Sequence, residues 1–352
     1  MIQAIKDYYT FRIVRKIADG GMGSVYEAIQ DGTKGFEKTV ALKTLLAQLN
    51  QSEKLVDMFI EEGKLVANLV HENIVQIYQL GRTTHGYYIV MEYVNGLSLH
   101  ELLRSHFLGG IVFPRELSVF VSSRIARGLA YAHSRKDAYG KHMNIVHRDV
   151  CPNNVMVTTE GLPKLADFGI AKATSNLRTA SDRSLMGKFT YMPPEQATRG
   201  AVDFRADIFS LGAILFEMLA GQKIRGEASQ EGLHQQAIDG FVDWDSLPDD
   251  LDGKLRTILT TCLAPNPTDR YDSTQEVARS LEYHIYKDGY GPTIQTLEEY
   301  MRRKFPSLYQ VKKKSPQPAA DDGKRQGVMP AEVTSAATLI MDDHEPQSAG
   351  AE

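Results

Sequence analysis

The period of the hydrophobic pattern changes near residue 95, and this change constrains the fold more than any other feature. Up to Val94, apolar residues come in short runs such as TFRIVRKI, SVYEAIQ, TVALKTL, VQIYQLG and YYIVMEY. These runs predict antiparallel strands, interrupted by one helical pattern over residues 52–70. After Asn95 long amphipathic helices follow, including one that we expect to begin at Pro114. The sequence therefore predicts an α+β chain of two lobes.

We expect four segments along the chain. Residues 1–94 predict a small antiparallel-sheet lobe with one helix, and residues 95–290 a larger, mainly helical lobe. Residues 291–309, which include TIQTLEEYMRRKF, predict a helical extension. Residues 310–352 carry too few large apolar side chains to offset their chain entropy, so we expect a disordered tail.

Charge and cysteine content bear on partners and location. A net charge of −4 does not suggest binding to nucleic acid or to a membrane surface. The N-terminus lacks a signal-peptide pattern, and two widely separated cysteines fit a reducing cytoplasm. The longest apolar stretch, Ile208 to Gly221, is too short to span a bilayer and contains Glu217, so we expect a buried core helix there. We expect a cytoplasmic protein.

The densest group of polar side chains lies in the segment IVHRDVCPNNVMV. It places His147, Arg148, Asp149 and Asn154 between two strand-like runs. Charged and amide groups at this density predict a loop that holds its side chains for chemistry. One residue is out of place in such a loop, because Cys151 follows two positions after Asp149.

A glycine-rich segment, IADGGMGSVYEA, offers a place for an anion. Without a Cβ, Gly20, Gly21 and Gly23 let backbone N–H groups approach an anion closely. Neither a dinucleotide fingerprint nor a Walker loop fits, because a strand follows and the Gly-Lys-Ser/Thr ending is absent. Taken alone, the pattern is equally that of an ordinary turn.

Two further segments carry charges among apolar residues. Lys43 in VALK is either an outward surface lysine or the partner of Glu62 on the following helix, in a pair that would aim its ammonium at a phosphate. Asp167 in LADFGIA lies where a charge is costly unless a cation is bound. Asn154 and Asp167 together would offer the hard oxygen ligands that Mg²⁺ takes.

In this order the motifs resemble the protein kinase signature set. The resemblance runs from about Phe11 to Glu282 and includes the later segments YMPPEQ, DIFSLG and NPTDRY. The GGMG loop is most similar to that of the eukaryotic-like serine/threonine kinases of bacteria. The resemblance implies the bilobal protein kinase fold, with ATP and Mg²⁺ as ligands.

The resemblance also implies roles for particular residues. Asp149 would accept the proton of the attacking hydroxyl, Lys43, steadied by Glu62, would hold the α- and β-phosphates, and Asn154 and Asp167 would carry Mg²⁺. The residues implied in ATP binding are Ile17, Gly20, Gly21, Gly23, Val25, Ala41, Lys43, Glu92, Val94 and Met156.

Other implied roles concern the surroundings of the nucleotide. The Glu92 carbonyl and the Val94 amide would meet the adenine edge, with Met91 as gatekeeper. His147 would pack against Phe168 rather than carry a proton.

In the second lobe the resemblance implies one ion pair and one brace. Glu195 and Arg270 would form a structural ion pair, and Asp207 would brace the catalytic loop. Arg148 would bind a phosphate group on the loop that follows Asp167. We therefore expect activation by phosphorylation in trans within a transient homodimer, at one of the hydroxyls of Thr179, Ser181 and Ser184. The alternative is that these are ordinary polar loop residues.

Cys151 departs from the family pattern, which has lysine at this position. Losing that charge would cost about 3 to 4 kcal/mol of transition-state stabilisation, roughly 10² to 10³ in rate. Lys188 stands where threonine is usual, and it would return the missing ammonium from the other side of the cleft. The alternative is that Lys188 merely replaces threonine on an exposed loop.

Three functions fit these motifs. The first is an active serine/threonine protein kinase with protein substrates. The second is a pseudokinase, which binds partners or nucleotide without efficient transfer, although a scaffold has no need of a complete set of phosphoryl-transfer groups. The third, a small-molecule kinase, is disfavoured by YMPPEQ and Arg270, which resemble peptide-substrate machinery.

Overall fold

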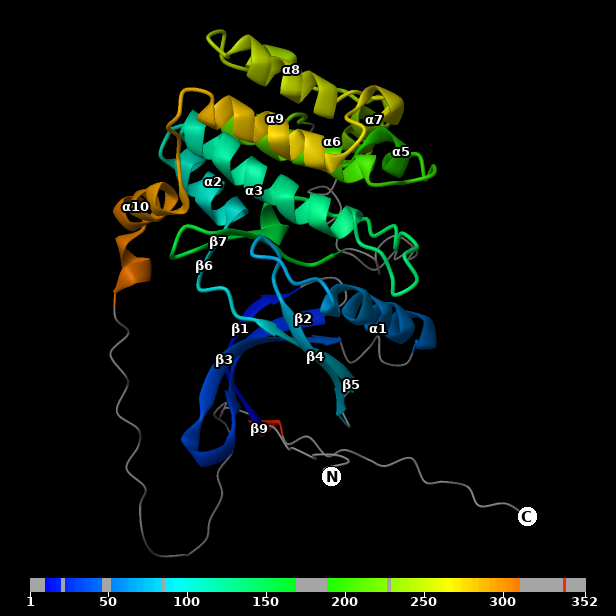
Figure 1. Cartoon of the computed structure of the whole chain (residues 1–352), viewed down its shortest axis with the longest axis vertical. Coiled ribbons are helices and arrows are strands. Elements are labelled where there is room, and N and C mark those ends of the chain that lie inside the picture. Colours follow the sequence, from blue (N-terminus) through cyan, green and yellow to red (C-terminus); the bar gives the residue numbers. More distant parts are fainter. Residues whose placement is uncertain are drawn as a thin grey trace, which may run out of the picture.

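Two lobes make up the computed structural model of the chain, one built on a sheet and the other on helices (Figure 1). It describes residues 10–19, 23–45, 52–83, 86–168, 189–226, 229–310 and 338–339, without the side chains of Glu62, Thr83, Thr338 and Leu339. The predicted α+β bilobal fold is confirmed.

The first lobe is built on one sheet with the strand order β4-β5-β3-β2-β1-β9. Its strands are β1 (Thr10–Asp19), β2 (Gly23–Asp31), β3 (Glu37–Leu45), β4 (Ile77–Thr83), β5 (Gly86–Glu92) and β9 (Thr338–Leu339). All neighbouring pairs are antiparallel. The five predicted strands are therefore confirmed, together with their antiparallel pairing.

The register of β3 determines which face of the sheet Lys43 occupies. Lys43 lies opposite Val25 on β2. Val40 and Leu42 are fully buried in a hydrophobic cluster on one side of the sheet. Because side chains alternate across a strand, Ala41 and Lys43 lie on the other side. On that other side, the Lys43 ammonium reaches Asp167 of the second lobe.

The short strand β9 is paired with the outer edge of β1, in a part of the chain expected to be disordered. Leu339 lies opposite Phe11, and Thr338 opposite Arg12. An open strand edge is extended by backbone hydrogen bonds, so composition alone did not reveal this pairing. These two residues belong to the tail that we expected to be disordered, and that expectation stays a prediction for the tail as a whole. The remaining tail, 311–337 and 340–352, lies outside the described residues.

Helix α1 (Glu53–Ala67) is the predicted helix of the first lobe. Its residue Phe59 is buried in a cluster with Leu45 of β3 and Ile89 of β5. This apolar contact holds α1 against the sheet, beside the lobe boundary (Figure 1).

The second lobe is mainly helical. Its helices are α2 (Leu99–Leu108), α3 (Arg115–His133), α5 (Pro194–Ala197), α6 (Arg205–Ala220), α7 (Gln230–Ile238), α8 (Gly253–Cys262), α9 (Thr274–Tyr286) and α10 (Ile294–Lys304). Four short 3₁₀ turns also belong to this lobe: η3 (Pro152–Asn154), η5 (Trp244–Ser246), η6 (Pro267–Asp269) and η7 (Pro306–Tyr309).

Helix α6 forms the centre of this lobe and is buried on nearly all sides. The prediction of a core helix within residues 208–221 is confirmed. Among the described residues, no helix has the length and apolar character needed to cross a membrane. Helix α3 begins one residue later than expected, because Pro114 is its N-cap, with an extended ψ of 130°.

A small sheet lies at the lobe boundary and carries the polar loop. It has the order β6-β7-β8, with β6 (Gly96–Ser98), β7 (Val155–Thr158) and β8 (Pro163–Leu165). β7 follows Asn154 directly, and β8 precedes Asp167. Antiparallel pairing of the two strands therefore brings these two residues to the same end of the sheet.

Helix α10 packs against the second lobe through three buried side chains, Leu297, Tyr300 and Met301. Tyr300 meets His106 of α2 in a hydrogen bond. His106 Nδ1 donates to the Leu102 carbonyl at 2.7 Å, so its Nε2 is the acceptor for the Tyr300 hydroxyl. This arrangement suits a neutral imidazole.

We expect His106 to make the free energy of unfolding depend on pH. Burial lowers the pKa of His106, and Lys304 lowers it further, against the opposing effect of the hydrogen bond to Leu102. As the pH falls below about 6.5, the unfolded chain takes up a proton that the folded chain resists, so stability falls. Urea unfolding between pH 7.5 and 5.5 should show a steeper loss for the wild type than for His106→Gln. Parallel pH profiles would contradict this assignment.

Candidate active site

One buried carboxylate fixes the loop between α3 and β7. Asp207 of α6 is fully buried and accepts the backbone N–H groups of His147 at 2.7 Å and Arg148 at 2.8 Å. It also accepts from His133 Nε2 at 2.8 Å. Burial alone would raise the pKa of Asp207, but these hydrogen bonds and the nearby histidines lower it. Asp207 braces the loop, as the resemblance implied.

His147 packs against Phe168, with the two ring centroids 4.5 Å apart, and His147 is fully buried. Its Nδ1 accepts the Asp149 N–H at 3.3 Å, and its Nε2 donates to the Ala166 carbonyl at 3.1 Å. These contacts use both ring nitrogens of a neutral imidazole. The packing role expected for His147 is therefore confirmed.

Asp149 is held by the asparagine that follows it in the loop. Asn154 Nδ2 donates to the backbone carbonyl of Asp149 at 2.7 Å and to its carboxylate Oδ2 at 3.0 Å. Asn154 is itself buried, and its own carbonyl accepts the Ala166 N–H at 2.8 Å. The carboxylate of Asp149 thus has a fixed orientation at the end of β7.

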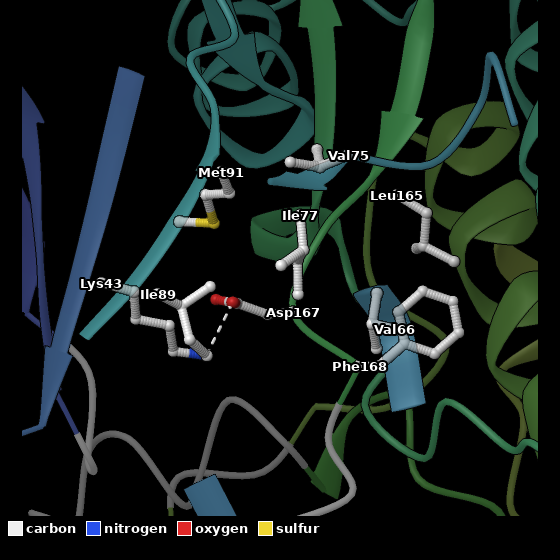
Figure 2. A pocket seen from close by; sticks show the side chains of 9 residues that line it. All are labelled: Lys43, Val66, Val75, Ile77, Ile89, Met91, Leu165, Asp167 and Phe168. Carbon is white, nitrogen blue, oxygen red and sulfur yellow. Dashed lines mark hydrogen bonds and ion pairs between the residues drawn. The ribbon is translucent and has the colours of Figure 1, made fainter. Parts of the chain in front are cut away.

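Asp167 and Lys43 form an ion pair across the lobe boundary. Lys43 Nζ lies 2.9 Å from Asp167 Oδ1, as Figure 2 shows. Asp167 has a φ of +54°, and Arg148 in the catalytic loop has a φ of +64°. Side chains other than glycine rarely adopt this left-handed region, and such backbone strain gathers at functional sites.

A small cavity lies beside this ion pair, between the lobes (Figure 2). It is lined by Lys43, Val66, Val75, Ile77, Ile89, Met91, Leu165, Asp167 and Phe168. Apart from the two charged residues the lining is apolar, which strengthens the electrostatic attraction within it. Met91 contributes to this wall, where the resemblance placed a gatekeeper.

The segment that joins the lobes is tied to the second lobe by a second ion pair. Glu92 at the end of β5 lies 2.9 Å from Lys164 Nζ of β8. The Glu92 N–H donates to the Gln76 carbonyl at 2.8 Å. Sequence reasoning missed Lys164, whose signal is a single lysine inside the apolar segment LPKLA.

The other residues implied in ATP binding lie on strands at the boundary. Gly23 begins β2 where a Cβ would lie 2.2 Å from the Thr44 carbonyl oxygen, so only glycine fits there. Val25 and Ala41 lie on neighbouring strands β2 and β3, and Met156 lies on β7. Ile17 of β1 is 41% exposed. Their contacts with a nucleotide remain predictions.

Several predicted positions lie outside the described residues. They are Gly20, Gly21, the side chain of Glu62, Thr179, Ser181, Ser184 and Lys188. Two expectations therefore stay predictions: the pairing of Lys43 with Glu62, and the supply by Lys188 of the positive charge that is missing at Cys151.

Cys151 is the N-cap of the turn η3, and its side chain is of intermediate exposure. Its side chain packs against the edge of the main hydrophobic core. It lies close enough to Tyr191 to contribute to the raised pKa of that phenol, which burial raises most. Cys151 is thus next to the segment that precedes α5.

Two polar pairs anchor the segment around α5. Arg270 and Glu195 form the implied bidentate pair, with Nη1–Oε1 at 2.7 Å and Nη2–Oε2 at 2.9 Å. The Tyr191 hydroxyl donates to Glu217 Oε2 at 2.5 Å. Burial raises the pKa of Glu217. Sequence reasoning missed this second pair, although Glu217 inside an apolar run was its signal.

The donor set suits a magnesium ion shared with phosphates. The amide oxygen of Asn154 and the carboxylate of Asp167 are hard ligands, and Mg²⁺ commonly takes only one or two protein side chains beside phosphates and waters. In the part of the chain that the structure describes, no three or more His, Cys, Asp or Glu side chains form a cluster able to hold a metal. The residues fit a metal that arrives with the nucleotide.

The sheet lobe, the helical lobe and the charged groups at their boundary define a two-lobed kinase architecture. The chain belongs to the protein kinase domain family, whose model matches residues 11–281.

Known proteins with similar sequences are bacterial protein kinases. The chain is 35% identical over 311 residues to the tyrosine-protein kinase MasK of Myxococcus xanthus. The aligned residues cover 87% of this chain and 47% of MasK. It is 31% identical over 294 residues to the serine/threonine-protein kinase PrkC of Bacillus subtilis, covering 82% of this chain and 42% of PrkC. The chain thus spans less than half the length of these relatives.

A solved structure shows the same fold. The kinase domain of PknI from Mycobacterium tuberculosis, solved as a point mutant, is 26% identical and superposes with a TM-score of 0.58. The superposition covers 80% of this chain and 98% of that domain.

Removing the charge of Asp207 should loosen the catalytic loop. In Asp207→Asn an NH₂ group replaces one oxygen, so at least one buried N–H or imidazole loses its acceptor. We expect the free energy of unfolding to fall by about 1 to 3 kcal/mol, measured by urea unfolding.

Asp203→Asn is the matched control. Asp203 is exposed at the start of the same helix and accepts from the Arg205 N–H at 2.8 Å, which asparagine also does. A loss in this control equal to that in Asp207→Asn would show that Asp207 is no special brace.

Proposed function

We propose that the chain transfers the γ-phosphoryl group of Mg-ATP to serine and threonine hydroxyls of proteins. The observation that carries this proposal is the meeting of Lys43 and Asp167 across the lobe boundary, next to the held pair of Asp149 and Asn154. A phosphoryl-transfer enzyme works mainly by positioning and electrostatic stabilisation, and these four groups supply both.

Each of these residues has one proposed task. Asp149 orients the attacking hydroxyl and accepts its proton, and the hydrogen bond from Asn154 keeps its carboxylate aimed. Lys43 binds the α- and β-phosphates. Asp167 and the amide oxygen of Asn154 hold Mg²⁺, which when bound neutralises negative charge on the phosphates.

The nucleotide site is proposed to extend along both lobes. Its backbone contacts are the amides of the glycine loop, the Glu92 carbonyl and the Val94 amide. Its apolar contacts are Ile17, Val25, Ala41 and Met156. We further propose that the domain works in the cytoplasm, where Mg-ATP is available.

Removing the charge of Lys43 or of Asp149 should abolish phosphate transfer while the protein still folds. With labelled ATP and Mg²⁺, Lys43→Met and Asp149→Asn should each lower the rate of phosphate transfer to protein by at least about 10². Lys38→Met is the matched control, because Lys38 lies on the same strand and contacts the Tyr78 ring instead.

A pseudokinase would give a different pattern. It would bind nucleotide, seen as a thermal shift with Mg-ATP, while the wild type transferred no more phosphate than Asp149→Asn. That result would show that the chain is a nucleotide-binding pseudokinase and not an active kinase.

The class of hydroxyl needs its own measurement, because MasK is named a tyrosine-protein kinase. We propose serine and threonine because other relatives, such as PrkC, are named for those residues. Phosphoamino acid analysis of the labelled products separates the two classes. Phosphotyrosine as the main product would overturn the assignment to serine and threonine.

We also propose activation by autophosphorylation in trans at Thr179, Ser181 or Ser184. Arg148 supports this, because its buried Nε has no hydrogen-bond partner in the described part of the chain. A phosphate on the loop would supply charge-assisted acceptors for such a guanidinium. Mass mapping of active protein that found no phosphate in this loop would end the proposal.

We propose that Lys188 returns the positive charge that Cys151 does not supply. Lys188→Met should then lower the turnover rate by about 10² to 10³, the effect of losing one stabilising donor. Adding Cys151→Lys to Lys188→Met should recover part of this rate. An unchanged rate in Lys188→Met, with Asp149→Ala inactive, would remove Lys188 from the mechanism.

A further inference from the structure

Arg225 is a buried arginine in the loop that follows α6. Its residue is 1% exposed. One nitrogen, Nη1, donates to two backbone carbonyls, that of Phe189 at 3.0 Å and that of Met192 at 3.1 Å. A single guanidinium therefore spans the short segment 189–192, which leads into α5.

The rest of this segment is held from the same side. Ser210 of α6 donates to the Tyr191 carbonyl at 2.8 Å, and the Tyr191 hydroxyl donates to Glu217 of α6. Together with Arg225, these bonds take up the carbonyls of residues 189, 191 and 192. The backbone of the segment is fixed by side chains of α6 and of the loop after it.

The charge of Arg225 has no carboxylate partner among the residues that the structure describes. Its Nε and Nη2 are buried there without any hydrogen bond. Burial lowers the pKa of the Arg225 guanidinium to about 10, so it is still protonated near pH 7. Such a buried cation is costly, and an apolar side chain of similar volume would fill the same space at lower cost.

Arg270 shows what a compensated arginine looks like in the same place. The guanidinium carbons of Arg225 and Arg270 lie 5.6 and 5.0 Å from the centroid of the Phe209 ring. Arg270 is neutralised by Glu195, whereas the hydrogen bonds of Arg225 within the described part of the chain go to backbone carbonyls. A contribution to stability therefore accounts for the presence of an arginine at position 270 better than at position 225.

The segment under Arg225 lies beside the catalytic loop. Gln196 of α5 donates to the Arg148 carbonyl at 3.0 Å, one residue before Asp149. Tyr191 interacts electrostatically with Cys151, two residues after Asp149. A peptide whose hydroxyl reaches Asp149 must therefore pass next to this segment.

We propose that Arg225 is a positioning residue for the protein substrate. By donating from Nη1 to the Phe189 and Met192 carbonyls, it shapes the surface that receives the peptide. The proposal rests on the proposed protein kinase function. It assigns to Arg225 an effect on peptide affinity, and none on the nucleotide.

The test compares Arg225→Met and Arg225→Lys with the wild type on a serine-containing peptide selected from a degenerate library. Arg225→Met removes both hydrogen bonds, so the peptide KM should rise about tenfold while the KM for ATP stays within about twofold. Arg225→Lys keeps a charged donor on a shorter side chain of different geometry, which replaces the two hydrogen bonds of Nη1 only in part, so its peptide KM should be intermediate. An unchanged peptide KM in Arg225→Met, or an equal rise in both KM values, would overturn the proposal.

Arg124→Met is the matched control. The Arg124 guanidinium also lies over a phenylalanine ring, that of Phe120 at 4.9 Å, and its Nε is likewise buried without a partner among the described residues. It belongs to α3, away from the 189–192 segment. A peptide KM raised as much in this control would show a general effect of losing an arginine.

Hydrogen–deuterium exchange tests Arg225 independently of catalysis. In Arg225→Met, amides of residues 189–192 should exchange at least about threefold faster, with α6 unchanged. If the wild type transferred no phosphate to any protein, the proposed function would fail while this measurement still tested the contact. Unchanged exchange at residues 189–192 would overturn the positioning role.

Discussion

The carboxylate of Asp207 gathers three donors from segments far apart in sequence: the His147 and Arg148 amides of the catalytic loop and the imidazole of His133 at the end of α3. Helix α6 is buried on nearly all sides, so this carboxylate cannot move without disturbing the core. The loop takes its position from it, including the left-handed backbone of Arg148. The placement of Asp149 therefore depends on a residue that never needs to touch a substrate.

Two ion pairs join the lobes, one from within the short strand β8 and one from just after it. Lys164 within it pairs with Glu92 at the end of β5, and Asp167 just beyond it pairs with Lys43 on β3. The Asp167 side chain is 34% exposed, so its ion pair contributes only modest stability. The pair thus links the two lobes across their boundary without a large contribution to stability.

The sequence predicted features that depend on local pattern. The five strands, α1 and the core helix α6 follow from periodicity, and the packing of His147 follows from the family resemblance. It failed where tertiary contact decides: β9 pairs through its backbone, and Lys164, Glu217 and Arg225 find their roles only after distant segments meet. Lys164 and Glu217 are each a lone charge within an apolar run, whereas Arg225 lies in the mixed segment GQKIRGEA and carries no such signal. That signal marks a polar contact without naming its partner.

Positive charge is distributed unusually around the substrate side of the site. By resemblance, Cys151 stands where the family has lysine, while Lys188 directly precedes in sequence the segment that leads to α5 and Arg225 contacts that segment from the loop after α6. Arg225 is buried there against carbonyl oxygens, and Arg270 lies nearby with its charge compensated by Glu195. Carbonyl dipoles screen a buried guanidinium less completely than a carboxylate does, so a net positive field remains under this segment.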